Sequence, residues 1–65
     1  MSVIVNGKSV PLPTPGNLAG LLSSLAPQKP FAIARNLEFV PESEYTRCEL
    51  NDGDCIEIVH PSAGG

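Results

Sequence analysis

The sequence predicts a single α+β domain in which one helix packs against a small β-sheet. A chain of 65 residues has room for one hydrophobic core. An apolar fraction of 42%, with only 17% charged residues, is sufficient to fold such a core. Apolar residues alternate as in strands near both ends of the chain and follow a helical period between them, which gives the element order β-β-α-β-β.

The first segment, residues 2–12, is predicted to be a β-hairpin. Asn6-Gly7 at its centre is the pair that best tolerates the positive φ angles of a two-residue turn. This turn pairs the two strands so that one face collects the apolar side chains. We expect that face to be covered; it consists of Met1, Val3, Val5, Val10 and Leu12.

A helix is predicted to follow the hairpin, with Asn17 as its N-cap. Leucines recur at the i, i+3, i+4, i+7 spacing of one helical face. They are Leu18, Leu21, Leu22 and Leu25. Gly20 inside this helix costs roughly 1 kcal/mol relative to alanine, so the helix depends on packing its leucines against the sheet. Pro27 and Pro30 are expected to end it.

The second half of the chain is predicted to complete the sheet. Residues 31–35 are apolar enough to form a central strand, and residues 37–40 form a short partner strand after a turn at Asn36. The tight turn at residues 51–54 starts a last strand, residues 55–60, in which apolar and polar residues alternate.

Residues 42–48 show no clear period, and we expect a turn or a single helical turn around Tyr45. The predicted core consists of Val3, Val5, Val10, Leu18, Leu21, Leu22, Leu25, Ile33, Ile56 and Ile58.

The side chains of the domain do not form the pattern of an enzyme active site. His60, the single histidine, is expected to be exposed or partly packed and not a general base. Cys48 and Cys55 have the spacing of neither a redox pair nor a zinc site, and we expect both to be buried. Two acidic pairs in turns are expected to be solvated: Glu42 with Glu44, and Asp52 with Asp54. We therefore predict no catalytic, cofactor-binding or metal-binding residue.

The charge and hydropathy of the chain exclude several classes of partner. A net charge of −3 argues against nucleic acid, which requires a basic surface. No apolar run approaches the roughly 20 residues of a membrane span, and the N-terminus lacks the pattern of a signal peptide. We expect a cytoplasmic protein with no membrane partner that is a monomer when free.

The closing Gly64-Gly65, which follows a strand introduced by an Asp-Gly-Asp turn, is more specific than any residue inside the domain. The hairpin, the leucine-faced helix, residues 32–36, residues 39–41 and this end together resemble the ubiquitin-like sulfur carriers of thiamin (thiazole) biosynthesis, the ThiS family. The likeness covers nearly the whole chain.

This resemblance implies a β-grasp fold, in which a mixed sheet of four or five strands wraps one main helix and the last strand lies parallel beside the first. Residues 1–61 would form this domain, and residues 62–65 would form a flexible Gly-Gly tail.

The resemblance also implies a carrier protein, not an enzyme, that binds no cofactor. An adenylating enzyme of the ubiquitin-activating type would use ATP to adenylate the carboxylate of Gly65. A sulfur donor such as a cysteine desulfurase would convert it to a thiocarboxylate, and thiazole synthase would take the sulfur. The partners would recognise Gly64 and Ala63 as parts of the tail.

Two departures from the family leave alternatives open. The turn after Asn36 commonly carries glycine in such carriers, whereas Leu37 stands here, so the positive φ is expected at Asn36 or the turn has another form. Pro61 and Ser62 are similar to the tail of the molybdopterin-synthase small subunit. The sulfur could thus go to molybdopterin, cysteine or another metabolite. A ubiquitin-like modifier of lysines, or an interaction module whose Gly-Gly end is incidental, are further alternatives.

Overall fold

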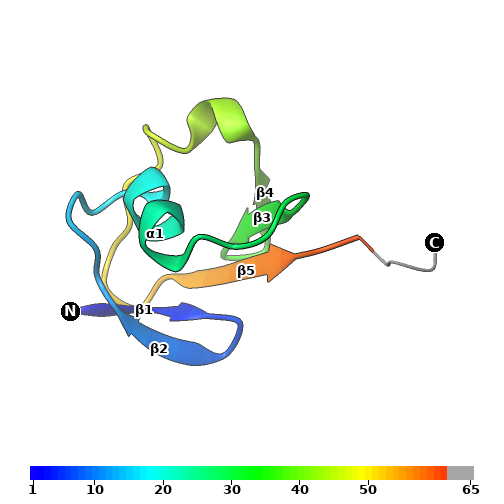
Figure 1. Cartoon of the computed structure of the whole chain (residues 1–65). Coiled ribbons are helices and arrows are strands. Elements are labelled where there is room, and N and C mark those ends of the chain that lie inside the picture. Colours follow the sequence, from blue (N-terminus) through cyan, green and yellow to red (C-terminus); the bar gives the residue numbers. More distant parts are fainter. Residues whose placement is uncertain (62–65) are drawn as a thin grey trace.

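The computed structural model describes residues 1–61, and the predicted tail, residues 62–65, lies outside the described residues. Within residues 1–61, five strands form one mixed sheet in the order β2-β1-β5-β3-β4. The strands are β1 (Ser2–Val5), β2 (Lys8–Pro11), β3 (Ala32–Arg35), β4 (Glu38–Val40) and β5 (Cys55–Val59). The helix α1 (Leu18–Leu25) covers one face of this sheet (Figure 1). No helix within the described part of the chain is long and apolar enough to cross a membrane.

The last strand, β5, occupies the centre of the sheet. It pairs in parallel with β1 on one edge and antiparallel with β3 on the other. A mixed sheet that packs on one helix, with the last strand parallel beside the first, is the β-grasp arrangement of ubiquitin-like proteins. The predicted fold class is therefore confirmed.

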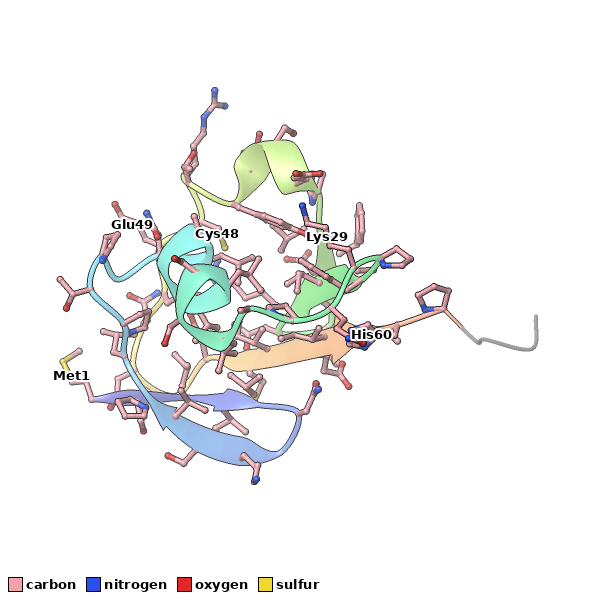
Figure 2. The ribbon with its side chains drawn as sticks, in the orientation of Figure 1. Met1, Lys29, Cys48, Glu49 and His60 are labelled. Carbon is pink, nitrogen blue, oxygen red and sulfur yellow. The ribbon has the colours of Figure 1, made fainter. Side chains whose placement is uncertain are left out.

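The hairpin of β1 and β2 has the predicted register, with Val3 opposite Val10. Asn6 and Gly7 adopt φ angles of 49° and 85°, as a two-residue turn requires. The expectation for Met1 is wrong, because it precedes β1 and its side chain is 84% exposed. Figure 2 shows this side chain projecting at the rim of the domain.

The helix begins and packs as predicted over most of its length. The N–H of Gly20 donates to Oδ1 of the N-cap Asn17 at 2.7 Å. Leu25, however, is 38% exposed, and its predicted burial is wrong. It is the last helical residue, and Ala26 follows with a φ of 48°, so the chain leaves the helical direction at that point. The helix thus ends two residues before Pro27.

Gly20 has a packing role that its helix propensity does not reveal. A Cβ atom built at this position would collide with the carbonyl oxygen of Pro15 and lie 3.2 Å from Oδ1 of Asn17. The absence of a side chain therefore allows the N-terminal turn of α1 to approach the segment that leads into it.

The core joins residues of α1 to one face of the sheet. Val10 and Ile58 were expected in it and are only partly buried. Leu50 is buried although no expected element contained it, and its N–H donates to the carbonyl of Gly16 at 2.9 Å. The buried residues are Val3, Val5, Leu18, Leu21, Leu22, Ile33, Leu50 and Ile56.

The connections of the second half follow their local sequence. Asn36 and Leu37 have φ angles of 51° and 72°, so the positive φ expected at Asn36 extends to Leu37, which is 90% exposed. A 3-10 helix, Glu42–Glu44, forms within the segment that was expected to be a turn or a single helical turn.

Candidate functional site

The candidate site is the C-terminal end of β5, the last strand before Gly65 in the sequence. This end lies on the side of the domain opposite to the N-terminus (Figure 1). The predicted site residues Gly65, Gly64 and Ala63 lie outside the described residues. The described part of the site is consequently its base, which comprises His60, Pro61 and the contacts that hold the C-terminal end of β5.

His60 anchors the chain directly after β5. Its Nε2 lies 2.9 Å from the carbonyl oxygen of Gln28, and because a carbonyl only accepts, Nε2 must carry the hydrogen. The imidazole ring also meets the ring of Phe31 in an edge arrangement, with centroids 6.4 Å apart. His60 is thus exposed and partly packed, as expected, and ties the base of the tail to the loop after α1.

Two asparagines, one from each hairpin turn, hold the two ends of β5. Asn6 accepts a hydrogen bond from the N–H of Ile58 at 2.9 Å and donates to its carbonyl at 3.3 Å. Asn36 accepts from the N–H of Cys55 at 3.0 Å. Both asparagines have a left-handed backbone, at the point where their own strand ends. The side-chain carbonyl of each asparagine therefore accepts a hydrogen bond from β5 that the main chain of its own strand would accept if that strand continued.

Both asparagines were predicted as turn residues, whereas their contacts with β5 were not predicted. The available signal was the asparagine at the first position of each turn. Aspartate or glycine would also suit such a turn, but aspartate lacks the donor of the amide, and glycine lacks both the donor and the acceptor. The partner strand could not be read from the sequence, because Asn6 and Ile58 are 52 residues apart.

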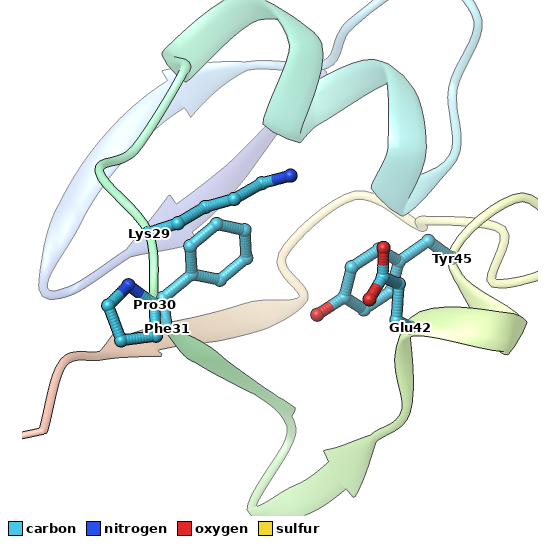
Figure 3. A pocket seen from close by; sticks show the side chains of 5 residues that line it. All are labelled: Lys29, Pro30, Phe31, Glu42 and Tyr45. Carbon is cyan, nitrogen blue, oxygen red and sulfur yellow. The ribbon is translucent and has the colours of Figure 1, made fainter.

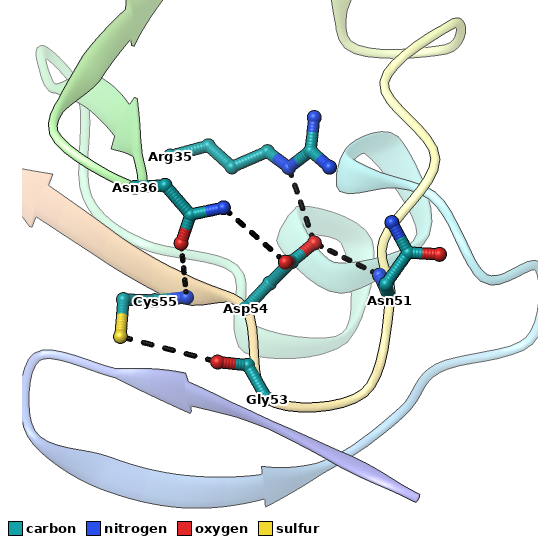
Figure 4. Close-up of polar contacts among 6 residues, drawn as sticks. All are labelled: Arg35, Asn36, Asn51, Gly53, Asp54 and Cys55. Atoms are coloured by element: carbon teal, nitrogen blue, oxygen red, sulfur yellow. Dashed lines mark hydrogen bonds and ion pairs between the residues drawn. The ribbon is translucent and has the colours of Figure 1, made fainter.

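A polar network joins the start of β5 to the turn before it (Figure 4). The carboxylate of Asp54 accepts hydrogen bonds from the N–H of Asn51 at 2.8 Å, from Nδ2 of Asn36 at 3.2 Å and from Nε of Arg35 at 3.1 Å. The N–H of Asn51 is the largest cause that holds the pKa of Asp54 below its ordinary value, and Asn36 and Arg35 lower this pKa further. The expectation of a solvated Asp54 is wrong, because its side chain is 11% exposed and caps the turn.

Asp54→Asn is expected to remove an acid-dependent part of the stability. Because the pKa of Asp54 is lower in the folded chain, its carboxylate contributes stability that is complete above the ordinary pKa of 3.8. That contribution is lost as the pH falls through the lower, folded pKa. The measurement is the melting temperature as a function of pH, from about pH 7 down to about pH 2.

Asp52→Asn is the matched control for this prediction, because it makes the same change in the same turn, at an exposed side chain that accepts the N–H of Ser2 at 2.8 Å. Below about pH 4, the wild type and Asp52→Asn should lose melting temperature more steeply than Asp54→Asn. Equal slopes in all three proteins would mean that the Asp54 network contributes nothing to acid sensitivity.

The two cysteines differ in their surroundings. Cys48 is half-buried, whereas Cys55 is exposed, so the expected burial of Cys55 is wrong. Neighbouring residues of a strand face opposite sides, and Ile56 occupies the core side. Within residues 1–61, no group of three or more His, Cys, Asp or Glu side chains could hold a metal ion.

A shallow hollow of about 230 Å³ lies beside the loop that His60 contacts (Figure 3). Burial and the charge of Glu42 raise the pKa of the Tyr45 hydroxyl there. Among the described residues, no hydrogen bond links two of the lining side chains, so the hollow has no nucleophile paired with a base. Its lining consists of Lys29, Pro30, Phe31, Glu42 and Tyr45.

Comparison with known proteins gives a consistent result. Residues 2–65 match the sequence profile of the ThiS family. The crystal structure of a thiamine biosynthesis protein (ThiS) from Geobacter metallireducens superposes with a TM-score of 0.80 at 27% sequence identity, and the match covers 100% of both chains. A thiazole synthase from Paramagnetospirillum magneticum is 36% identical over 66 residues. That match covers 100% of this chain and 20% of the relative, so the chain spans about a fifth of the length of this curated relative.

Proposed function

Because the chain belongs to the ThiS family and is a thiamin sulfur carrier, we propose that the carboxylate of Gly65 is the group that carries the sulfur. The observation that supports this most strongly is the family match itself, which continues through the tail to Gly65. The domain offers no competing site, since the described residues include no catalytic constellation. In this role the protein is a co-substrate of other enzymes.

The proposed chemistry begins with activation of the carboxylate. A carboxylate oxygen of Gly65 attacks the α-phosphorus of ATP on an adenylating partner, and pyrophosphate leaves. The outer sulfur of the donor's persulfide then attacks the carbonyl carbon, and AMP leaves with the electron pair of the C–O bond, so that an acyl disulfide joins the chain to the donor. A thiol reduces this S–S bond, which leaves the thiocarboxylate on the protein and a disulfide between the thiol and the donor.

Glycine suits both of these steps. Without a Cβ atom, Gly64 and Gly65 can enter a channel too narrow for other residues and can adopt backbone angles that other residues avoid. Residues 61–65 can extend by at most roughly 17 Å, which is sufficient to leave the domain and enter the site of a partner.

The proposed recipient of the sulfur is a thiazole synthase, and the reaction is expected in the cytoplasm. The relative from Paramagnetospirillum magneticum bears the name thiazole synthase and includes a segment similar to this whole chain. This supports a thiazole recipient over molybdopterin or cysteine. The proposed sulfur donor is a cysteine desulfurase or an enzyme of the same class.

Deletion of the gene tests the recipient. Cells without this protein should require thiazole or thiamin for growth, while their molybdenum enzymes and cysteine synthesis should stay intact. Growth without thiazole, or a loss of molybdenum enzymes instead, would contradict a role in thiazole formation. Isopeptide-linked conjugates of the chain with lysines of other proteins would favour the modifier alternative.

A further inference from the structure

We propose that Asn6 is a positioning residue for the carboxylate of Gly65: its side-chain amide holds β5 at Ile58 and thereby fixes the last part of the domain that precedes residues 62–65 in the chain. The inference rests on the proposed function of Gly65. It concerns a residue in the first hairpin turn, more than fifty positions away from that group.

The first step is the point at which β1 stops supporting β5. The N–H of Ile4 donates to the carbonyl of Asp54 at 2.8 Å, and the N–H of Asn6 donates to the carbonyl of Ile56 at 2.9 Å. In a parallel pair, the next bonds of this ladder would involve Ile58. The main chain of β1 cannot form them, because it turns away at Asn6 with a φ of 49°. The side-chain amide of Asn6 forms both, as donor and as acceptor.

The second step is the short distance from this contact to the tail. On its other edge, β5 pairs with β3, where Ile33 lies opposite Ile58 and Ala32 lies opposite Val59. Without the amide of Asn6, the last residues of β5 would be held on that edge alone, together with the bond from His60 to Gln28. Ile58 would then lose its support on the side of β1.

The third step is the effect of the end of β5 on the position of Gly65. Four residues beyond Pro61 span at most roughly 14 Å, so a displacement of the end of β5 changes which positions in a partner's site the carboxylate of Gly65 can reach. Displacements of about 1 Å at a reacting group can reduce a rate by roughly 100-fold. The amide of Asn6, which both donates to and accepts from Ile58, therefore affects the position of the reacting carboxylate indirectly, by fixing the end of β5.

The other hairpin provides a matched control. Asn36 has a φ of 51°, and its side-chain amide also makes two hydrogen bonds, with the N–H of Cys55 at 3.0 Å and with Oδ1 of Asp54 at 3.2 Å. These bonds hold the start of β5, at the opposite end from the tail. Asn6→Gly and Asn36→Gly both keep a residue that tolerates positive φ, and both remove two bonds.

The experiment measures ATP-pyrophosphate exchange by the cognate adenylating enzyme, and the concentration of the full-length chain is varied. The assay temperature lies below the melting temperature of every variant. Asn6→Gly should lower kcat roughly tenfold with KM unchanged, because the docking surfaces stay intact while fewer complexes have the carboxylate in place. Asn36→Gly should keep the wild-type kcat. Hydrogen exchange at the amide of Ile58 should become faster in Asn6→Gly only.

If Asn6→Gly does not fold, Asn6→Asp is the replacement variant. Aspartate tolerates a left-handed backbone and keeps the acceptor for the N–H of Ile58. Its kcat should lie between those of the wild type and Asn6→Gly. Equal losses of kcat in Asn6→Gly and Asn36→Gly, a raised KM at unchanged kcat, or full activity despite faster exchange at Ile58 would each overturn the positioning role. A wild-type chain that supports no exchange at all would instead overturn the proposed function.

Discussion

A chain that lacks Gly65 is expected to lose adenylation and to keep its fold. The truncation moves the terminal carboxylate back by one residue, roughly 3.5 Å, which is enough to remove it from the reacting phosphorus. The buried core residues and the apolar residues packed against them lie between Val3 and Ile58, so their packing is unaffected. ATP-pyrophosphate exchange should fall by roughly 100-fold or more, while the melting curve matches that of the full chain.

Two substitutions in the tail sharpen this prediction. Gly64→Val should act like the truncation, because a β-branched side chain restricts the backbone and would collide with a close-fitting channel. Ser62→Ala keeps the length of the tail and both glycines, and it should retain full exchange. If the chain without Gly65 supports exchange as well as the full chain does, then the carboxylate of Gly65 is not the reacting group.

Gly20→Ala is expected to destabilise the domain by roughly 3 kcal/mol. Helix propensity alone predicts the opposite, a gain of roughly 1 kcal/mol from replacing a glycine inside a helix. The added Cβ would collide with the carbonyl oxygen of Pro15, which is main chain and cannot rotate away as a side chain would. A domain of 65 residues has a total stability of only roughly 3 to 10 kcal/mol, so much of it would be lost.

The measurement for this prediction is the free energy of unfolding in urea. Ser23→Ala is the control, because Ser23 is exposed on the same helix and alanine there should raise stability by a few tenths of a kcal/mol, roughly the difference in propensity. A Gly20→Ala variant that gains as much as helix propensity alone predicts would show that α1 can move away from Pro15 at no cost.

The features that local chemistry specifies could be predicted from the sequence. The Asn6-Gly7 pair and the alternation around it gave the register of the first hairpin. The leucine spacing and the Asn17 cap gave the buried face and the start of α1. In each case two independent signals, turn or cap chemistry and hydrophobic period, agreed over a few neighbouring residues.

The features that depend on distant residues could not be predicted. Leu50 fills the core from a segment without a period, because its burial depends on where α1 lies. The exposure of Leu25 results from the left-handed turn at Ala26, which no glycine marks. Asp54 forms its network with Arg35, which lies 19 positions earlier in the chain.

The candidate site divides in the same way. Gly65 was predicted as the site residue because of the family resemblance and because the sequence of the domain contains no recognisable set of catalytic side chains. The chemistry at Gly65 is the proposal made above. The base of the site, where Asn6 and His60 hold the end of β5, emerged only from the fold, because it joins the first hairpin, the loop after α1 and the last strand.

The most direct test of the sulfur-carrier role is the intact mass of the protein isolated from its own cells, followed by fragmentation. We predict a population that is heavier by roughly 16 Da, the replacement of one oxygen by sulfur, with the added mass confined to a C-terminal Gly65. A chain that continues past Gly65, or sulfur that adds roughly 32 Da as a persulfide on Cys48 or Cys55 while Gly65 stays unmodified, would contradict it.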